Sequence, residues 1–213
     1  MIEKTVVLFA NSIKNHQHCV AGKDIKTKKW IRPVANESGK ELTYSQVLIK
    51  NPYGVYEAKP LQRAEIKFIK HAPLPNQPEN YVVSNQTWIQ RYTISRDEIK
   101  EYLDYPDNLW IDYTSEKDRV DYRLIENGVF PIYQSLYLIE VEKIHIYWFD
   151  RSNFGRNPQR RGKFRYEGIV YDLPITDPKF SEFSEKNLYN KYLCISLGEK
   201  FNGYCYKIIA AIL

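Results

Sequence analysis

Short segments that alternate apolar and polar residues, each ended by turn residues, recur along most of this 213-residue sequence. Alternation with a period of two is the pattern of a half-buried β-strand. We expect about ten short strands from this pattern. The clearest lie at residues 5–13, 19–25, 30–34, 64–72, 133–149, 164–170, 191–198 and 204–213. So many short strands with frequent turns predict a mainly β chain built as a sandwich or as barrels.

Local signals add detail to three of these strands. Asn202-Gly203 is a hairpin signal between the last two strands. Pro33 predicts that the strand at 30–34 ends there or lies at a sheet edge. The apolar phase of 133–149 slips at Glu142–Lys143, which predicts a β-bulge or a break into two strands.

Two segments predict short helices, and one predicts a loop. Ser95 with Glu98 forms a capping-box pattern ahead of apolar residues. Residues 118–127 form a second helical pattern with Gly128 as its stop. Residues 35–62 lack periodicity, so we expect a long loop there with one short helical or strand piece. The length fits two consecutive five-stranded barrels: 1–128, carrying the loop and a helical insert, and 129–213.

The positive charge of the chain is concentrated in residues 151–165. This segment contains six basic residues and no acidic one, namely Arg151, Arg156, Arg160, Arg161, Lys163 and Arg165. The rest of the chain has 25 basic and 26 acidic side chains, so the segment carries all of the positive excess of +5. A local positive field beside aromatic residues suits nucleic acid or a nucleotide. The alternatives are a solvated basic loop, or pairing with the acidic segment 97–126.

Specific residues follow from this hypothesis of a non-catalytic module that binds single-stranded DNA or RNA. The expected phosphate contacts are Lys14, Arg32, Arg160, Arg161, Lys163 and Arg165. Trp30 and Tyr166 are the expected stacking rings. On a closed strand face, Trp30 is instead a core residue and Arg32 pairs with an acid.

A second hypothesis is a cleft between the two barrels that binds a small nucleotide or a modified base. Its lining would be Arg32, Arg119, Asp177 and Lys207. Lys207 draws attention because it interrupts an apolar strand, where a buried lysine needs a partner. A third hypothesis is a nuclease or base-modifying enzyme that uses carboxylates of the acidic segment, although no spacing there assigns a catalytic residue.

Several other functions lack a supporting pattern. His16, His18 and Cys19 do not complete a zinc ligand set, and the sequence has no Walker A or G-x-G-x-x-G motif. We therefore predict no metal and no cofactor. Cys194 and Cys205 lie in apolar strands, where a thiol behaves as a small hydrophobe. The apolar run 6–10 is too short for a signal peptide, and no window is long enough for a membrane span, so we expect a cytoplasmic protein.

Both ends of the sequence carry motifs that resemble the bacterial dual OB domain-containing proteins. The N-terminal motifs are A-N-S-x-K at 10–14, C-V-A-G at 19–22 and W-I-R-P-V at 30–34. The C-terminal motifs are S-L-G-E at 196–199, G-Y-C-Y-K at 203–207 and A-A-I at 210–212. The resemblance implies two OB-type barrels and a nucleic-acid or nucleotide partner, and it brings no assigned catalytic residue. Residues 35–100 match poorly.

Overall fold

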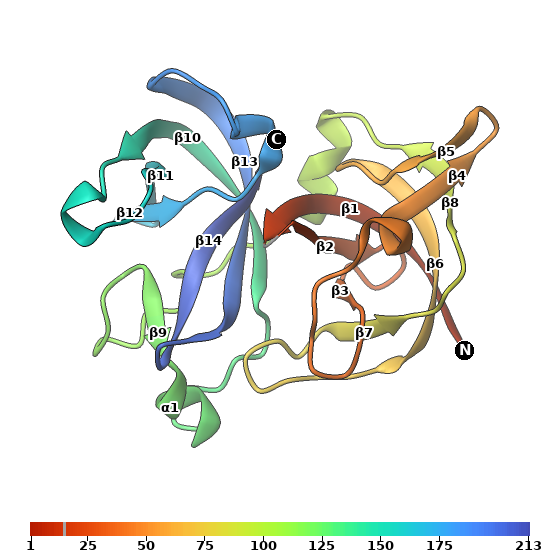
Figure 1. The fold of residues 1–213 in the computed structure, drawn as a ribbon, viewed down its shortest axis with the longest axis horizontal. Helices are drawn as coiled ribbons and strands as arrows, with labels where there is room; N and C mark the ends of the chain where they lie inside the picture. The colour runs from red at the N-terminus through yellow and green to blue at the C-terminus, as the bar shows by residue number, and fades with distance from the viewer. Residues whose placement is uncertain (15) are drawn as a thin grey trace. The chain divides into compact units, whose positions relative to one another are not determined.

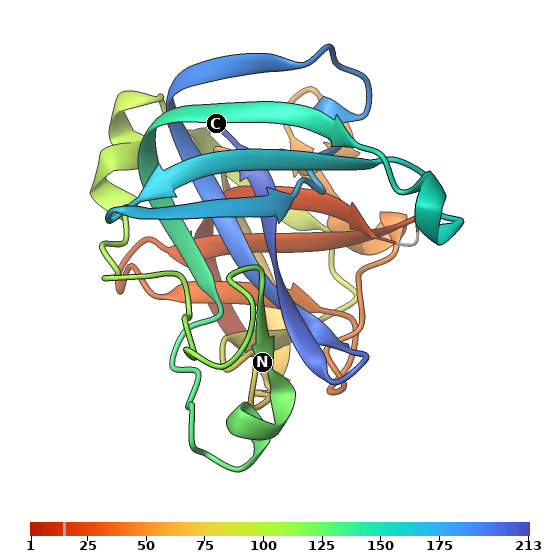
Figure 2. The ribbon, with the colours of Figure 1, turned by 90° about the vertical axis from the view of Figure 1, so that its left-hand side faces the viewer.

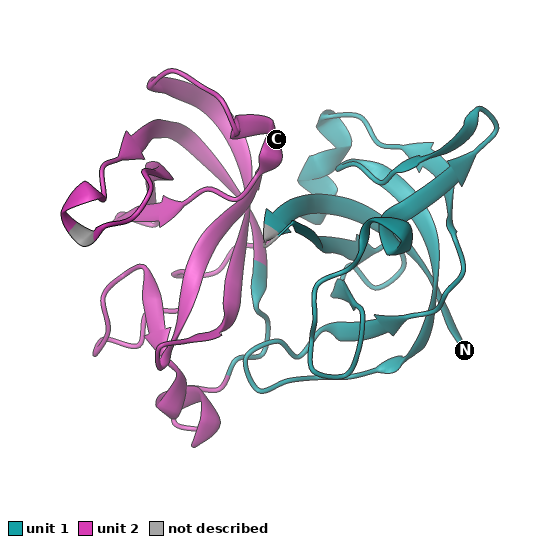
Figure 3. Cartoon of the chain, in the orientation of Figure 1, with its two compact units in different colours: residues 1–103, 132–136 teal, residues 104–131, 137–213 magenta. Residues whose placement is uncertain are grey.

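The computed structural model, which describes residues 1–14 and 16–213, is mainly β, as the strand pattern predicts (Figure 1). The chain divides into two compact units (Figure 3). Unit 1 comprises residues 1–103 and 132–136, and unit 2 comprises residues 104–131 and 137–213. This division differs from the expected boundary between residues 128 and 129. Residues 119–121 pair with a C-terminal strand of unit 2, while residues 132–136 return to unit 1.

Unit 1 contains a closed barrel of five strands. The strands are β1 (Ile2–Lys14), β2 (Gln17–Asp24), β3 (Trp30–Val34), β6 (Gln62–His71) and β7 (Asn80–Val83). They follow the order β1-β2-β3-β7-β6, and β1 pairs with β6 to close the barrel. β3 and β7 run parallel, and the other pairs are antiparallel. This is the Greek-key barrel expected of an OB fold.

Pro33 lies inside this barrel and not at an edge. β2 pairs with β3 only at Trp30 and Ile31, and β7 pairs with the residues from Arg32 to Val34. Pro33 has no N–H to donate, and it stands where the ladder to β2 has already ended. The expected edge position is therefore not seen, and β3 ends at Val34, one residue beyond the end expected at Pro33.

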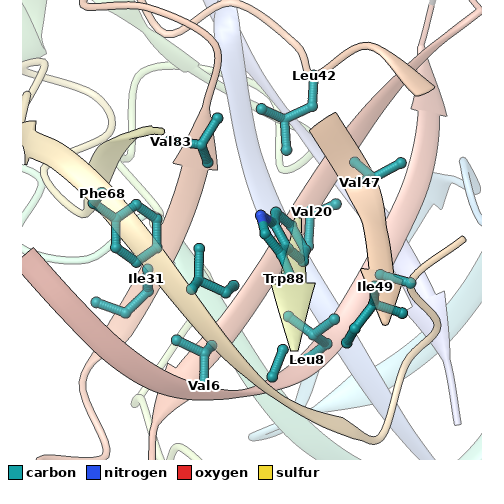
Figure 4. Packing of buried hydrophobic residues seen from close by; sticks show 13 residues of the cluster. Val6, Leu8, Val20, Ile31, Leu42, Val47, Ile49, Phe68, Val83 and Trp88 are labelled. Carbon is teal, nitrogen blue, oxygen red and sulfur yellow. The ribbon is translucent and has the colours of Figure 1, made fainter. Parts of the chain in front are cut away.

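Three further strands extend the sheet of unit 1 beyond β6. They are β8 (Trp88–Thr93), β4 (Leu48–Asn51) and β5 (Gly54–Glu57), in that order. The expected loop at 35–62 thus contains a hairpin, preceded by the 3-10 helix η1 (Tyr44–Val47). Ile49 and Trp88 bring this extension into the core cluster around Leu8, Ile66 and Phe68 (Figure 4). These strands therefore form because a few of their apolar side chains are buried, although their sequence has no periodic pattern.

Unit 2 contains a six-stranded curled sheet in the order β12-β11-β10-β13-β14-β9. Its strands are β9 (Arg119–Asp121), β10 (Leu136–Phe149), β11 (Gln159–Tyr166), β12 (Ile169–Pro174), β13 (Lys186–Phe201) and β14 (Tyr204–Ile212). Ile175, just after β12, forms a parallel bridge with Ile209 of β14. The strands β10-β11-β12-β14-β13 therefore repeat the order of the barrel in unit 1.

The helical elements are short. The segment expected as one helix at 118–127 is β9 followed by α1 (Tyr122–Glu126). The Asp121 side chain accepts a hydrogen bond from the Arg123 N–H and so caps α1. The remaining helices are the 3-10 helices η2 (Asp97–Tyr102), η3 (Ser152–Phe154) and η4 (Pro178–Phe180). Among the described residues, no helix is both long and apolar enough to cross a membrane.

Candidate nucleic-acid interface

The basic segment lies on the part of unit 2 that corresponds to the binding side of an OB barrel. Residues 150–158 connect β10 to β11, and the rest of the segment forms most of β11. In the order of the barrel, β11 and β12 are the second and third strands. Oligonucleotides and oligosaccharides bind OB barrels on this pair of strands and on the adjoining loop. Figure 2 shows β10, β11 and β12 crossing the front of the view.

Alternation along β11 places three cations on its outer face. Gly162, Phe164 and Tyr166 are buried, whereas Lys163 and Arg165 are exposed and Arg161 is half-buried. Side chains two residues apart on one strand are about 6.7 Å apart. The row Arg161–Lys163–Arg165, called here the cation row, therefore presents positive charges at regular intervals.

A row of rings on β10 flanks the cation row. Tyr147 lies opposite Arg161, and His145 lies opposite Lys163 in the antiparallel register. The rings of His145 and Tyr147 stack with centroids 5.6 Å apart. Phe149 is 42% exposed, and its centroid lies 5.8 Å from the Arg161 guanidinium carbon. His145, Tyr147 and Phe149, called here the ring row, thus lie beside the cations on the next strand.

Trp148 is a further exposed ring near the end of β10. Trp148 alternates with the residues of the ring row along β10, and its ring stacks on Phe183 with centroids 5.3 Å apart. Its indole Nε1 donates to the Phe183 carbonyl oxygen at 3.2 Å. Trp148 is nevertheless 43% exposed, so part of its ring remains in contact with solvent.

Asp172 of β12 forms an ion pair with Arg161 of the cation row. Arg161 Nε donates to Asp172 Oδ1 at 2.8 Å, and the Tyr147 hydroxyl donates to Asp172 Oδ2 at 2.5 Å. Burial, followed by the hydrogen bond to Asp172, raises the pKa of Tyr147 to about 12. Arg161 also donates to Gln159 Oε1. One carboxylate therefore links all three strands of the face.

Three other cations of the basic segment donate to backbone carbonyl oxygens. Arg160 donates to the Asp177 carbonyl oxygen, Arg165 to that of Gly168, and Arg151 to that of Asn157. Burial lowers the pKa of Arg160, although a guanidinium stays charged in proteins. Within the part of the chain that the structure describes, Arg161 is the one member of this segment in an ion pair.

Three acidic residues of unit 2, Glu116, Asp118 and Asp121, form ion pairs within their own segment. Arg119 lies 2.7 Å from Asp118 and 3.2 Å from Glu116, and Arg123 lies 2.7 Å from Asp121. Asp112 accepts hydrogen bonds from the N–H groups of the turn that follows it, and this helps to lower its pKa against the opposing effect of burial. These contacts organise the loop before β9 and leave the cation row positive.

Three other residues predicted for the interface do not present their side chains on this face. Trp30 is 4% exposed in unit 1, with its ring 6.0 Å from that of Phe9. Arg32 is buried, donates to Ser135 Oγ at 2.9 Å and lies 3.7 Å from Glu79. Tyr166 points into unit 2, where burial raises its pKa to about 12. Lys14 ends β1, and its side chain lies outside the described part of the chain.

Three residues predicted for the nucleotide cleft, Arg119, Asp177 and Lys207, make their contacts within unit 2. Lys207 is buried and donates to the Lys117 carbonyl oxygen at 2.8 Å, and burial lowers its pKa to about 8. Arg119 lies over the rings of Tyr204 and Tyr206. Asp177 accepts a hydrogen bond from the Ile212 N–H at 3.0 Å. These contacts hold together strand ends and loops of unit 2.

His18, near the N-terminus, takes part in a hydrogen-bond network that supports the fold. His18 is buried, and its Nδ1 lies 2.9 Å from Asn11 Oδ1. Asn11 in turn donates to Glu57 Oε1 and to the Ala58 carbonyl oxygen. In the described ranges 1–14 and 16–213, no three His, Cys, Asp or Glu side chains converge to hold a metal ion.

Reasoning from the sequence missed Tyr147, Phe149 and Asp172. A signal for the rings exists, because Tyr147-Trp148-Phe149 ends the strand immediately before the basic segment. Asp172 has no such signal. Its role depends on the register that sets β12 beside β11, where Lys163 lies opposite Asp172.

The sequence matches the model of one protein family, described as the dual OB-containing domain, over residues 4–212. No curated protein and no solved structure matches the chain.

Proposed function

The chain belongs to the dual OB-containing domain family, and on this premise we propose that it is a binding module for single-stranded nucleic acid. The ligand lies along the outer face of β10, β11 and β12. The observation that carries the proposal is the cation row on β11, one of the two strands that OB barrels use for binding, with the ring row beside it on β10.

The two rows match the two chemical parts of a single strand. Lys163 and Arg165 are exposed and free of carboxylate partners among the described residues, so they can attract consecutive phosphates. Phe149 offers a partly exposed ring on which an unpaired base can stack. In a duplex the bases already stack on each other, so the ring row favours single strands.

The test of the phosphate contacts is the salt dependence of binding. Fluorescence anisotropy with a labelled oligothymidine measures the affinity of the wild type and of the Lys163→Gln/Arg165→Gln variant at several salt concentrations. Loss of two phosphate contacts makes the log–log salt slope shallower by about 1.4. The matched control is Lys50→Gln/Lys59→Gln, which removes two exposed lysines from unit 1. Equal losses of affinity in the two variants contradict the proposed location.

The test of stacking is the substitution of Phe149. Phe149→Ala weakens binding of the same oligonucleotide by roughly five- to 150-fold, the range for one stacked base. Phe201→Ala removes another exposed phenylalanine of unit 2, which lies on β13 outside the ring row, and leaves the affinity unchanged. If duplex DNA of the same length binds the wild type as tightly as the single strand, the stacking argument is wrong.

A further inference from the structure

Asp172 of β12 lies beside the cation row, and its carboxylate is bound by donors that could also hold another anion. Both of its carboxylate oxygens are in use, Oδ1 by Arg161 and Oδ2 by the Tyr147 hydroxyl. Lys163 lies directly opposite Asp172 in the register of β11 and β12. A guanidinium and a phenol hydroxyl therefore hold one carboxylate, and Lys163 is the register partner of Asp172 on the neighbouring strand.

The same donors suit a phosphate group. Arginine binds carboxylate and phosphate through the same planar array of N–H donors. The contact between Arg161 and Asp172 is also partly open to solvent, since the Asp172 side chain is 37% exposed and that of Arg161 is 15% exposed. A partly exposed ion pair contributes little net free energy, so an incoming anion can replace it at small cost.

We propose that Asp172 is an internal competitor for phosphate at Arg161, and that it sets which ligands the face accepts. A single phosphate that displaces Asp172 from Arg161 makes no other contacts to offset the loss of that ion pair. A strand several nucleotides long also contacts Lys163, Arg165 and the ring row, and these contacts offset the displacement. Asp172 therefore selects oligonucleotides over mononucleotides and inorganic phosphate. This inference rests on the proposed function, since it concerns the same face.

The test is the Asp172→Asn variant, which keeps the shape of the side chain and an acceptor for Tyr147 but removes the charge. Anisotropy with labelled oligothymidine is measured across salt concentrations, with inorganic phosphate as a competitor. We expect the variant to bind about fivefold tighter, the size of one partly exposed charge pair. The salt slope becomes steeper by about 0.7 as Arg161 gains a phosphate contact. Inorganic phosphate competes better against the variant than against the wild type.

Two further variants make the outcome specific. Asp150→Asn removes a carboxylate that hydrogen-bonds to Ser152 in the loop after β10, so it reports the general effect of one less negative charge. The double variant Arg161→Gln/Asp172→Asn tests whether the tighter binding acts through Arg161. If it does, the double variant loses the increase in affinity that Asp172→Asn shows. Asp172→Ser, with a small neutral acceptor, repeats the measurement if the asparagine variant does not fold.

The results separate this inference from the proposed function. If the wild type binds the oligonucleotide but Asp172→Asn binds equally or more weakly, Asp172 serves to orient Arg161, and the competitor role is overturned. If neither protein binds, the proposed function fails, and the inference fails with it. Tighter binding by Asp172→Asn that equals the gain from Asp150→Asn also overturns the specific role of Asp172.

Discussion

Three buried cations are each held by an oxygen acceptor of their own unit. Lys23 donates to the Tyr102 carbonyl oxygen at 2.7 Å, Lys207 to that of Lys117, and Arg32 to Ser135 Oγ. A charge inside a protein requires such a partner because its loss of hydration is costly. Residue type alone therefore does not separate cations that support the fold from cations that meet a ligand, and the strand face has to be known.

Lys207 makes the stability of the protein depend on pH in the alkaline range. Burial lowers its pKa to about 8 from the ordinary 10.5. Between these values the unfolded state binds more protons than the folded state, so the free energy of unfolding rises with pH. Relative to Lys207→Met, we expect the wild type to gain about 3 kcal/mol between pH 7 and pH 10.5. Urea unfolding of both proteins measures this difference, in which tyrosine ionisation cancels. Parallel pH profiles would contradict it.

Arg32 is predicted to contribute to stability and not to binding. Arg32→Met leaves the buried Glu79 carboxylate without its cation, which costs about 3–5 kcal/mol of unfolding free energy. Arg32→Met/Glu79→Gln costs less than the sum of the single changes, because it removes both charges. Oligonucleotide affinity, measured below the melting temperature, stays at the wild-type value. Arg91→Met, which breaks an exposed pair with Glu65, is the control and has little effect. A loss of affinity in Arg32→Met would place Arg32 at the ligand.

At the scale of single elements, periodic segments were predictable and irregular ones were not. The strand expected at 30–34 is β3, and the hairpin expected at Asn202-Gly203 joins β13 to β14. The phase slip at Glu142–Lys143 is present as two adjacent exposed residues within the unbroken strand β10. Alternation and turn residues act locally, so sequence alone reveals them.

The helix signals in the sequence predicted the capping contacts correctly, but not the type or the length of the helices. The capping-box contacts form, since the Glu98 N–H donates to Ser95 Oγ and the Ser95 N–H donates to Glu98 Oε2, yet η2 is a 3-10 helix. At 118–127, pairing with β14 turns the first residues into β9. Tertiary contacts thus override local propensity. Asp172 was missed for a different reason, because the register of the β11–β12 hairpin cannot be read from the residue pattern.

Gly22 of β2 is predicted to be essential to the first hairpin. A Cβ at this position would lie 2.3 Å from the Val7 carbonyl oxygen, beside the register shift between Leu8 and Ala10. That oxygen is backbone, so it moves only if β1 shifts. Gly22→Ala is therefore expected to cost about 3 kcal/mol or more of unfolding free energy. Gly198→Ala on β13, where the nearest contact is 3.2 Å, costs about 1 kcal/mol or less. Urea midpoints compare the two, and similar costs would contradict the argument.

At the scale of the whole molecule, the two units share a strand order but differ in exposure. In unit 1, all five residues of β3 and most of β2 are buried. In unit 2, β11, the counterpart of β2, alternates between buried and exposed residues and carries the cation row. The sequence shows where the positive charge is concentrated, but it does not show that Trp30 and Arg32 are buried, because a strand with both faces covered has no distinct pattern of its own.

The division of the chain predicts which C-terminal fragment folds. A fragment 129–213, cut at the boundary expected from the sequence, lacks β9 and leaves the edge of β14 unpaired from Tyr204 to Tyr206. It also removes the Lys117 carbonyl oxygen that accepts from Lys207, so a buried ammonium group loses its partner. A fragment 104–213 keeps both contacts. We expect 104–213 to show cooperative thermal unfolding by circular dichroism, and 129–213 to aggregate or unfold without a transition. A fully cooperative transition in 129–213 would show that β9 is dispensable to the barrel of unit 2.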